Sequence, residues 1–357
     1  MDDIVLFHTH GINRFDFSTI TAEDLYAVDS VAFQRKALLC PTVYLKQESM
    51  GAFQSVLERY AYLKASGALS RILGFAIEGP ILGPRGGTPS GSVWTPTVAQ
   101  WKTIASWFSL GVRYIVVSPD VVDINQDIGD DFSFAELLSL IYQCGGRIAL
   151  GHFEGASPIV SADRSRSVID FLEHQYERSP YLILTDHLFN DMPRNFHHSF
   201  RTDAERSLRT ERLTAVLNAE WPDTDLSKLL GPVPAAILEA ARQGRLTPSL
   251  NFDGGHVDLA VCRKVVDYLG PTRVIAITDH TEIPTLAGEA LFKTNRTDLL
   301  YRADGVLAAS SANQEQQSRN MAQIGLDEPA IHSLFYGTPL AALDYRPCRL
   351  KNGSSAS

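Results

Sequence analysis

The sequence predicts a single (β/α)8 barrel, and two features of its hydrophobic pattern support this prediction. Short runs rich in Val, Ile and Leu show little polar alternation, which is typical of parallel strands covered on both faces. Longer amphipathic stretches lie between these runs, and most end in Gly, the usual stop signal of a helix. The alternation of the two kinds of segment favours a closed parallel barrel, with a doubly wound open sheet as the alternative.

The candidate elements follow one another along nearly the whole chain. The strand-like runs are 4–8, 37–44, 72–78, 114–119, 147–152, 181–187, 246–252 and 274–280. The clearest helical patterns are at 50–67, 97–111, 132–146, 233–244 and 257–270. We expect one barrel domain over 1–350 with a polar, Arg-rich helical insertion at about 190–232, a long irregular connection at 281–314, and a disordered tail at 351–357.

Composition excludes several classes of function. The chain has 357 residues, 45% hydrophobic and 20% charged, which is ordinary for a globular protein. Its net charge of −9 disfavours a nucleic-acid partner, because phosphate contacts need a basic surface. The 4 cysteines form no C-x-x-C pair, which fits a reducing compartment. No apolar run approaches the roughly 18 residues of a membrane span, and the N-terminus is too briefly apolar for a signal peptide. We therefore expect a cytoplasmic protein without a membrane partner.

Residues of metal-ligand types stand at the carboxyl ends of the predicted strands, where parallel barrels place their active sites. They are His8 and His10 at the first strand, Glu78 at the third, His152 at the fifth, His187 at the sixth and Asp279 at the eighth. Because these strand ends meet at one mouth, we expect the side chains to converge there. Imidazoles and carboxylates suit divalent metals, so we expect one or two ions, zinc first, with iron, manganese or cobalt as alternatives.

Each motif alone has an ordinary explanation. His8-Thr-His10 has the spacing that puts both rings on one side of a strand, but it also fits a pair of exposed or core histidines. Glu78 could extend into solvent, and Asp279 could cap a helix. The complete set is what favours a metal site. A carboxylate beside a metal-activated water can accept its proton and pass it to a leaving group, and Asp279 is our candidate for that role.

The chain resembles the amidohydrolase superfamily, and within it the family of N-acetylglucosamine-6-phosphate deacetylases. The stretches that carry the resemblance are FHTHGINRFDF, GFAIEGPILGPRGG, GHFEGA, DHLFNDMPR, NFDGGHVD, AITDH, DGVLAASS and YGTPLAAL. As a set they are quite specific, whereas any one alone is weak. The resemblance implies a metal-dependent enzyme that hydrolyses an acetamide to an amine and acetate. It also implies that Glu78, His152 and His187 hold one metal, while His8 and His10 support a second metal bridged by Glu78.

Other roles are implied for matched residues outside this ligand set. Asp279 would be the catalytic acid and base, and His256 would orient the substrate and polarise its acyl carbonyl. Asn190 and Asp191 lie where the family's loop contacts the sugar. In the family, an arginine from the inserted region reaches the substrate phosphate of the neighbouring subunit. Arg194 lies closest to the motif there and could meet an anionic substrate group, whereas the alternative is a solvated basic helix face. The family habit and the long insertion lead us to expect a homodimer.

The chain departs from the family pattern in three places. It has no room for the small β-sandwich that family members usually form from both chain ends, so we expect a barrel without that domain. The loop after E-G-P lacks the family's histidine; Arg85 could substitute for it, but a solvated loop arginine is the favoured interpretation. Asp279 is followed by His280, where a small residue is usual, so we expect His280 to line the pocket or contact a metal.

Our leading hypothesis is therefore an N-acyl hydrolase, a deacetylase acting on an amino sugar or a related small N-acyl compound. One alternative keeps the metal site but changes the reaction to hydrolysis of a lactone, a cyclic amide or a phosphoester, or to deamination, because a fold does not fix a function. The other alternative is a metal-free binding protein that kept the barrel.

Overall fold

Eight parallel strands form one closed barrel in the computed structural model, which describes residues 3–84, 86–153, 155, 157–196, 213–293 and 298–350. The strands follow one another around the barrel in sequence order: β1 (Ile4–Thr9), β4 (Ala37–Tyr44), β5 (Phe75–Glu78), β6 (Val112–Val117), β7 (Ile148–Leu150), β8 (Leu184–His187), β9 (Thr247–Asn251) and β10 (Ile275–Ile277). Backbone hydrogen bonds join the last strand to the first. The amide of Asp279 donates to the carbonyl of His8 at 3.1 Å, and the amide of His10 donates to the carbonyl of His280 at 2.9 Å. The barrel prediction is therefore confirmed, and the open-sheet alternative is wrong.

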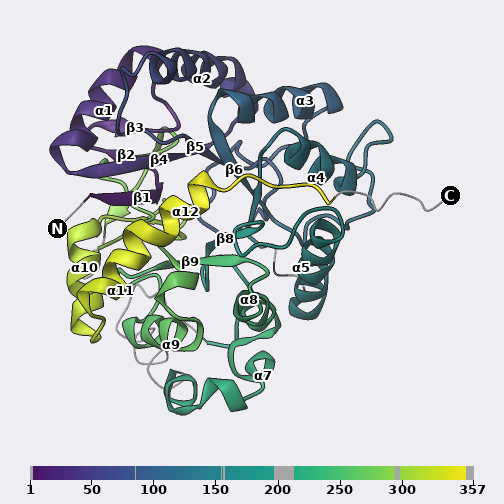
Figure 1. Ribbon diagram of the computed structural model, residues 1–357, viewed down its shortest axis with the longest axis vertical. Helices are drawn as coiled ribbons and strands as arrows, with labels where there is room; N and C mark the ends of the chain where they lie inside the picture. Colours follow the sequence, from purple (N-terminus) through teal and green to yellow (C-terminus); the bar gives the residue numbers. More distant parts are fainter. Residues whose placement is uncertain are drawn as a thin grey trace.

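Helices surround the strands, as Figure 1 shows. Their bounds are α1 (Leu25–Gln34), α2 (Met50–Ala65), α3 (Val98–Ser106), α4 (Phe134–Gln143), α5 (Pro158–Glu173), α7 (Leu226–Leu230), α8 (Pro232–Arg242), α9 (Leu259–Leu269), α10 (Gln314–Gln323), α11 (Glu328–His332) and α12 (Thr338–Asp344). Local sequence explains where several of them begin. The Ser133 hydroxyl accepts from the amide of Glu136 at the start of α4, and the Asp258 carboxylate caps α9.

Two apolar clusters stabilise this arrangement, one inside the barrel and one between the barrel and its helices. Along β1, Val5 and Phe7 belong to the interior cluster, whereas Leu6 belongs to the outer one. This is the two-residue alternation expected of a strand. Inside the barrel the rings of Phe7 and Tyr114 stack with their centroids 5.2 Å apart.

The C-terminal helix α12 covers the end of the barrel opposite the predicted site. It crosses the strands in Figure 1, where it is drawn in yellow. Its Ala342 and Leu343 join the interior cluster, against which Leu38, Leu73 and Tyr181 also pack. These three residues stand near the starts of their strands, so α12 lies at the N-terminal end of the barrel and leaves the carboxyl end to the loops.

Several connections at the carboxyl end contain short antiparallel strands rather than the irregular chain that we expected at 281–314. They form a hairpin of β11 (Thr285–Leu286) with β12 (Glu289–Ala290), a sheet of β13 (Phe292–Lys293), β14 (Leu299–Tyr301) and β15 (Leu307–Ser310), and a pair of β2 (Gly11–Ile12) with β3 (Phe15–Asp16). Strands this short leave no clear alternation in a sequence. Apart from the barrel, the described residues contain only these small sheets, so no separate β-sandwich is found among them.

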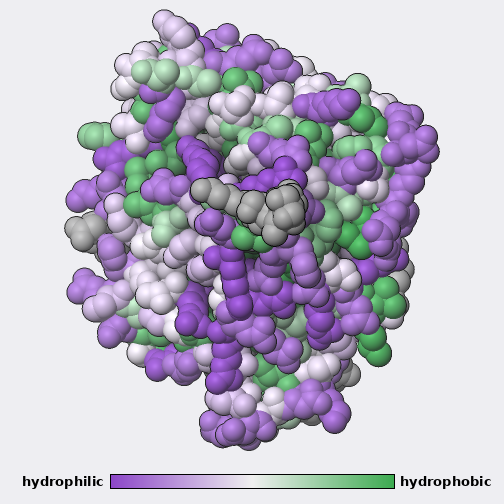
Figure 2. Space-filling model, turned by 45° about the vertical axis from the view of Figure 1, so that its right-hand side comes forward, coloured by the Kyte–Doolittle hydropathy of each residue, from purple (hydrophilic) through white to green (hydrophobic). Residues whose placement is uncertain are grey.

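The predicted insertion at about 190–232 is described only in part. Residues 213–218 and α7 are helical, while 197–212 lie outside the described residues, as do Arg85 and the tail 351–357. On the face shown in Figure 2, polar residues predominate and hydrophobic ones are scattered among them. Within the described part of the chain, no helix has the length and apolarity needed to cross a membrane.

Candidate metal centre

The predicted ligands converge at the carboxyl end of the barrel, and local irregularities of the backbone direct them there. The pairing register shifts between Leu6 and Thr9 in β1, so one extra residue lies in the stretch that contains His8. His152, two residues after β7, has a φ of 50°, and Asp279, two residues after β10, has a φ of 45°. Left-handed backbone is costly for residues other than glycine and is found where the surrounding structure imposes it, often at functional sites.

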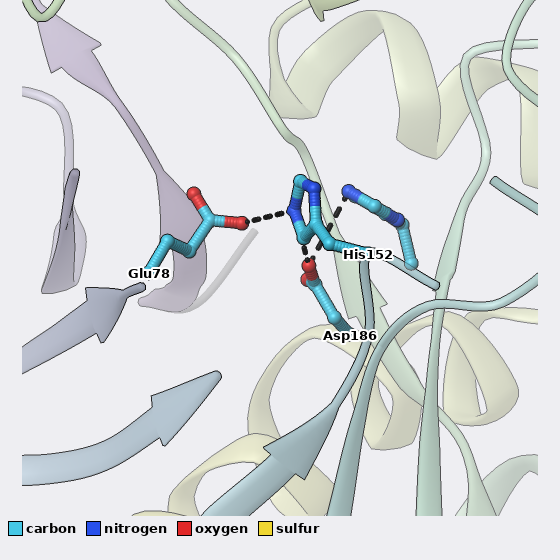
Figure 3. Close-up of side chains that lie close together, drawn as sticks. Glu78, His152 and Asp186 are labelled. Atoms are coloured by element: carbon cyan, nitrogen blue, oxygen red, sulfur yellow. Dashed lines mark hydrogen bonds and ion pairs between the residues drawn. The ribbon is translucent and has the colours of Figure 1, made fainter. Parts of the chain in front are cut away.

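The first group of possible ligands comprises Glu78, His152, Asp186 and His187, whose ligand atoms all lie within 4.8 Å of one another. His152 Nε2 lies 2.8 Å from Glu78 Oε1 and 3.1 Å from Asp186 Oδ2. His187 Nε2 lies 3.3 Å from the same Asp186 oxygen. Figure 3 shows the carboxylates of Glu78 and Asp186 approaching the His152 ring from two directions.

The second group comprises His8, His10 and Glu78, so that Glu78 belongs to both groups. His10 Nε2 lies 3.5 Å from Glu78 Oε2, and His8 Nε2 lies 3.7 Å from Glu78 Oε1. The two rings face the same side of β1, with centroids 5.0 Å apart. The sharing of Glu78 places it where a carboxylate would bridge two cations.

Asp279 connects the second group to His256. Its Oδ1 lies 3.1 Å from His10 Nε2, and its Oδ2 lies 3.2 Å from His256 Nε2. The other ring nitrogen of His256 lies 2.7 Å from Asp253 Oδ2. A buried chain of carboxylate, imidazole and carboxylate therefore runs from Asp253 to the centre.

Burial and charge act in opposite directions on these groups. Burial lowers the pKa of His8, although Asp186 and Glu78 favour its charged form. Burial also opposes the charge of His152, but Glu78 and the neighbouring aspartates raise its pKa well above the ordinary value. For His256, Asp253 and Asp279 outweigh burial and raise the pKa to about 10. Burial would raise the pKa of Asp279, yet the adjacent His10 and His256 hold it well below its usual range.

The residues present fit a divalent cation. Glu78 and the histidines of both groups are at most 3% exposed, so water cannot satisfy them. Many of their polar atoms nevertheless have no hydrogen-bond partner in the described structure, including His8 Nε2, both nitrogens of His10, Glu78 Oε2, both oxygens of Asp186, and His187 Nδ1. Buried polar groups without partners are costly, and a bound metal is one physical explanation of so many at one point. Imidazole nitrogens and carboxylate oxygens are the donors that zinc, iron and related ions use.

Two side chains contact His152 Nδ1, the ring nitrogen that faces away from Glu78. The Thr88 hydroxyl lies 3.1 Å from His152 Nδ1, and Asp191 Oδ2 lies 3.3 Å from it. The same Asp191 oxygen accepts from the amide of Gly87 at 3.2 Å. Carboxylates placed behind a metal-binding histidine fix its orientation. The structure therefore brings Asp191, which we expected to contact a sugar, against His152 and the loop after β5.

The remaining predicted residues lie around the centre but outside both groups. Asn190 is 7% exposed, lies three residues after His187 and donates its amide to the His187 carbonyl at 3.1 Å. Arg194 donates to the carbonyl of Met192 at 3.1 Å, its Nε has no hydrogen-bond partner among the described residues, and burial lowers its pKa to about 10.

His280 is missing from both groups and lines a separate cavity of about 530 Å³ with Arg35 and Glu282. The structure thus gives no support for His280 as a metal ligand.

Sequence reasoning missed two carboxylates of the site, Asp186 and Asp253. Strict alternation would point Asp186 away from the side that His187 faces, but the register shift between Leu184 and His187 lets both reach the site. Asp253 could have been found from the sequence. It precedes His256 by three residues in a Gly-rich loop, and this spacing is typical of an Asx turn. Its Oδ1 accepts from the amides of Gly255 and His256, both at 2.8 Å.

Neither known protein-family models nor curated protein sequences match this chain. Solved structures do. N-acetylglucosamine-6-phosphate deacetylase from Pasteurella multocida superposes with a TM-score of 0.68 at 15% identity, covering 98% of this chain and 79% of that one. The enzyme from Mycobacterium smegmatis gives 0.66 at 19% identity, and that from Thermotoga maritima 0.66 at 14%, each covering 96% of this chain and 78% of its own. The resemblance seen in the sequence is thus confirmed at the level of the fold.

Proposed function

We propose that this protein is a metal-dependent hydrolase that removes an N-acyl group, in the first instance acetyl, from an amino sugar or a related small molecule. The observation that carries the proposal is the pair of buried histidine and carboxylate groups that share Glu78 at the mouth of the barrel. The fold supports it, because the structural neighbours named above are deacetylases of an N-acetyl amino sugar phosphate.

The ligands of the centre would be Glu78, His152 and His187 for one ion, with His8 and His10 for a second. A divalent cation there would act as a Lewis acid and supply a nucleophilic water at neutral pH. Zinc is the first candidate by donor type, with iron, manganese or cobalt as the others.

Asp279 is placed to move the proton that amide hydrolysis requires. Its neighbours hold it ionised, so it can accept a proton from the attacking water and then deliver it to the departing nitrogen. His256, held by Asp253, carries the proton that its raised pKa implies and can donate a hydrogen bond towards the acyl oxygen. Water and amide are thereby converted into amine and carboxylic acid.

Two residues are candidates for binding the part of the substrate outside the acyl group. Arg194, a partly buried residue whose Nε has no hydrogen-bond partner among the described residues, is our candidate for binding an anionic group on the substrate. Asn190 is a candidate contact for the sugar. The homodimer and the cytoplasmic location stay predictions.

The test is release of amine and acetate by metal-loaded protein from N-acetylglucosamine with and without a 6-phosphate, beside lactones, cyclic amides, phosphoesters and aminated bases. We expect turnover of the N-acetyl compounds. Asp279→Asn should lower kcat by roughly 10²- to 10⁴-fold, because it removes the proton carrier. Asp267→Asn, on the exposed side of α9, is the matched control and should stay active. Wild-type activity of Asp279→Asn, or turnover of another class alone, would contradict the proposal.

A further inference from the structure

Asp186 is the least expected member of the centre, and its two oxygens face different histidines. Oδ2 lies 3.1 Å from His152 Nε2 and 3.3 Å from His187 Nε2. Oδ1 lies 3.3 Å from His8 Nδ1. Figure 3 shows this carboxylate and that of Glu78 both close to the His152 ring. Asp186 therefore touches residues of both groups, as Glu78 does.

The Asp186 oxygens, in a residue only 2% exposed, face the ring nitrogens of His8, His152 and His187 and accept no hydrogen bond of normal geometry from the described residues. Asp120, a second buried aspartate, follows β6 at the same end of the barrel and is satisfied by protein donors. Its Oδ1 accepts from the Ser118 hydroxyl at 2.7 Å, and its Oδ2 accepts from the Ser161 hydroxyl at 2.6 Å. Asp186 is instead surrounded by three imidazoles, two of which belong to the first group, so its oxygens lie where they could bind the same ion as those rings.

The backbone makes room for Asp186. A Cβ on Gly151 would lie 2.4 Å from the Cβ of Asp186 and 3.1 Å from its Oδ2, so any larger residue there would displace the carboxylate. The register shift in β8 brings the consecutive residues Asp186 and His187 to one site. Two neighbouring strands thus share in placing this side chain.

We propose that Asp186 is a fourth protein ligand of the ion held by Glu78, His152 and His187. It binds through Oδ2, while Oδ1 orients the His8 ring so that Nε2 faces the second group. The inference rests on the metal dependence proposed above and adds a ligand to it.

A fourth protein ligand changes the coordination that this centre requires. Catalytic zinc usually has three protein ligands and keeps its fourth, tetrahedral position for water. With four protein ligands, a position for water exists only in five- or six-coordinate geometry. Mn²⁺, Fe²⁺ and Co²⁺ adopt such geometry readily, and carboxylate-rich sites suit them. Because the same carboxylate orients His8, loss of Asp186 should also weaken the second group.

The experiment measures metal binding rather than activity. Full-length wild type, Asp186→Asn, Asp186→Ala and the control Asp120→Asn are stripped, titrated with Co²⁺ and Zn²⁺, and analysed for bound metal and for the visible spectrum of bound Co²⁺. We expect at least about tenfold weaker binding in both Asp186 variants, and wild-type binding in Asp120→Asn. Bound Co²⁺ should absorb weakly in wild type, as five- or six-coordinate ions do, and more intensely in Asp186→Ala as its coordination falls to four. Circular dichroism checks the fold, and the isosteric Asn variant guards against misfolding of the Ala variant.

The outcomes separate this inference from the proposed function. One outcome is that both Asp186 variants bind Co²⁺ and Zn²⁺ with the wild-type affinity and spectrum while Glu78→Gln loses binding. That result would overturn the role of Asp186 and leave the hydrolase proposal intact. Loss of metal binding in the Asp186 variants, with no turnover of N-acyl compounds by wild type, would support the ligand and refute the proposed substrate. Absence of binding by wild type would overturn both.

Discussion

At the scale of single residues, the carboxylates at the barrel mouth differ in whether the protein already satisfies them. Asp253 accepts from backbone amides and from His256, and Asp191 accepts from Gly87 and contacts His152. Glu78 Oε2 and both oxygens of Asp186 accept no hydrogen bond of normal geometry in the described structure and face only ring nitrogens of the histidines. This difference separates Asp253 and Asp191, which the protein already satisfies, from Glu78 and Asp186, which lie where they could bind a cation.

The first prediction concerns Asp253 as a positioning residue. Asp253→Asn should lower kcat by roughly 10-fold or more, because the raised pKa of His256 depends on the Asp253 charge. Metal content should not change, since neither Asp253 nor His256 belongs to the ligand groups. Steady-state kinetics and metal analysis on one preparation check both statements. Loss of metal together with activity would show that Asp253 acts on the centre as a whole.

The second prediction compares two glycines. Gly151→Ala should destabilise the protein by about 1–3 kcal/mol, because the new methyl group overlaps Asp186 in a packed interior. Gly51→Ala, in α2, meets no atom within 4 Å and should stabilise it by at most about 1 kcal/mol. Denaturant unfolding of the metal-free proteins measures both changes. Equal stability of the two variants would mean that the space beside Asp186 is not tight.

At the scale of elements, sequence reasoning located the strand ends but not their irregularities. The ends were predictable because the apolar runs stop at His, Glu or Asp, and because the strands of a parallel barrel bring their carboxyl ends together. The shifts in β1 and β8 and the positive φ of His152 depend on pairing with neighbours and leave no local pattern. Asp186 was missed for this reason. Asp191 was expected to contact the sugar, and in the structure its carboxylate lies against the His152 ring.

The third prediction tests α12 as the cover of the barrel's other end. Leu343→Ala should cost about 2–5 kcal/mol, because Leu343 is 2% exposed and packs into the interior cluster. Ile159→Ala, on α5 at 66% exposure, should stay within about 0.5 kcal/mol of wild type. Both variants should retain metal and kcat when folded. A neutral Leu343→Ala would show that α12 contributes little to barrel stability.

At the scale of the whole molecule, the order of strand and helix in the sequence was enough to predict the barrel, and the barrel then predicted where its ligands would meet. The small sheets at 281–314 were not predicted, since strands of two to four residues are too short for a periodic signal. His280 was expected at the pocket, but its backbone closes the barrel while its side chain lines another cavity.

The fourth prediction follows from the burial of so many charged and unpartnered groups in one place. Removing the metal with a chelator should lower the melting temperature, because the ion binds the folded chain and relieves repulsion among the carboxylates. Restoring the ion at about 100 times its Kd should return about 2.7 kcal/mol of stability. Scanning calorimetry with and without added metal measures this. Identical melting curves would show that the cluster is stable without a cation.

The central claim, that buried side chains of separate strands hold a divalent cation, is tested most directly by anomalous scattering from crystals of protein loaded with Zn²⁺ or Co²⁺. We predict a peak about 2.0–2.2 Å from the nearest atoms of Glu78, His152 and His187, with Asp186 Oδ2 at a similar distance. Ordered side chains at this position without an anomalous peak, or a peak only at surface residues, would contradict the account.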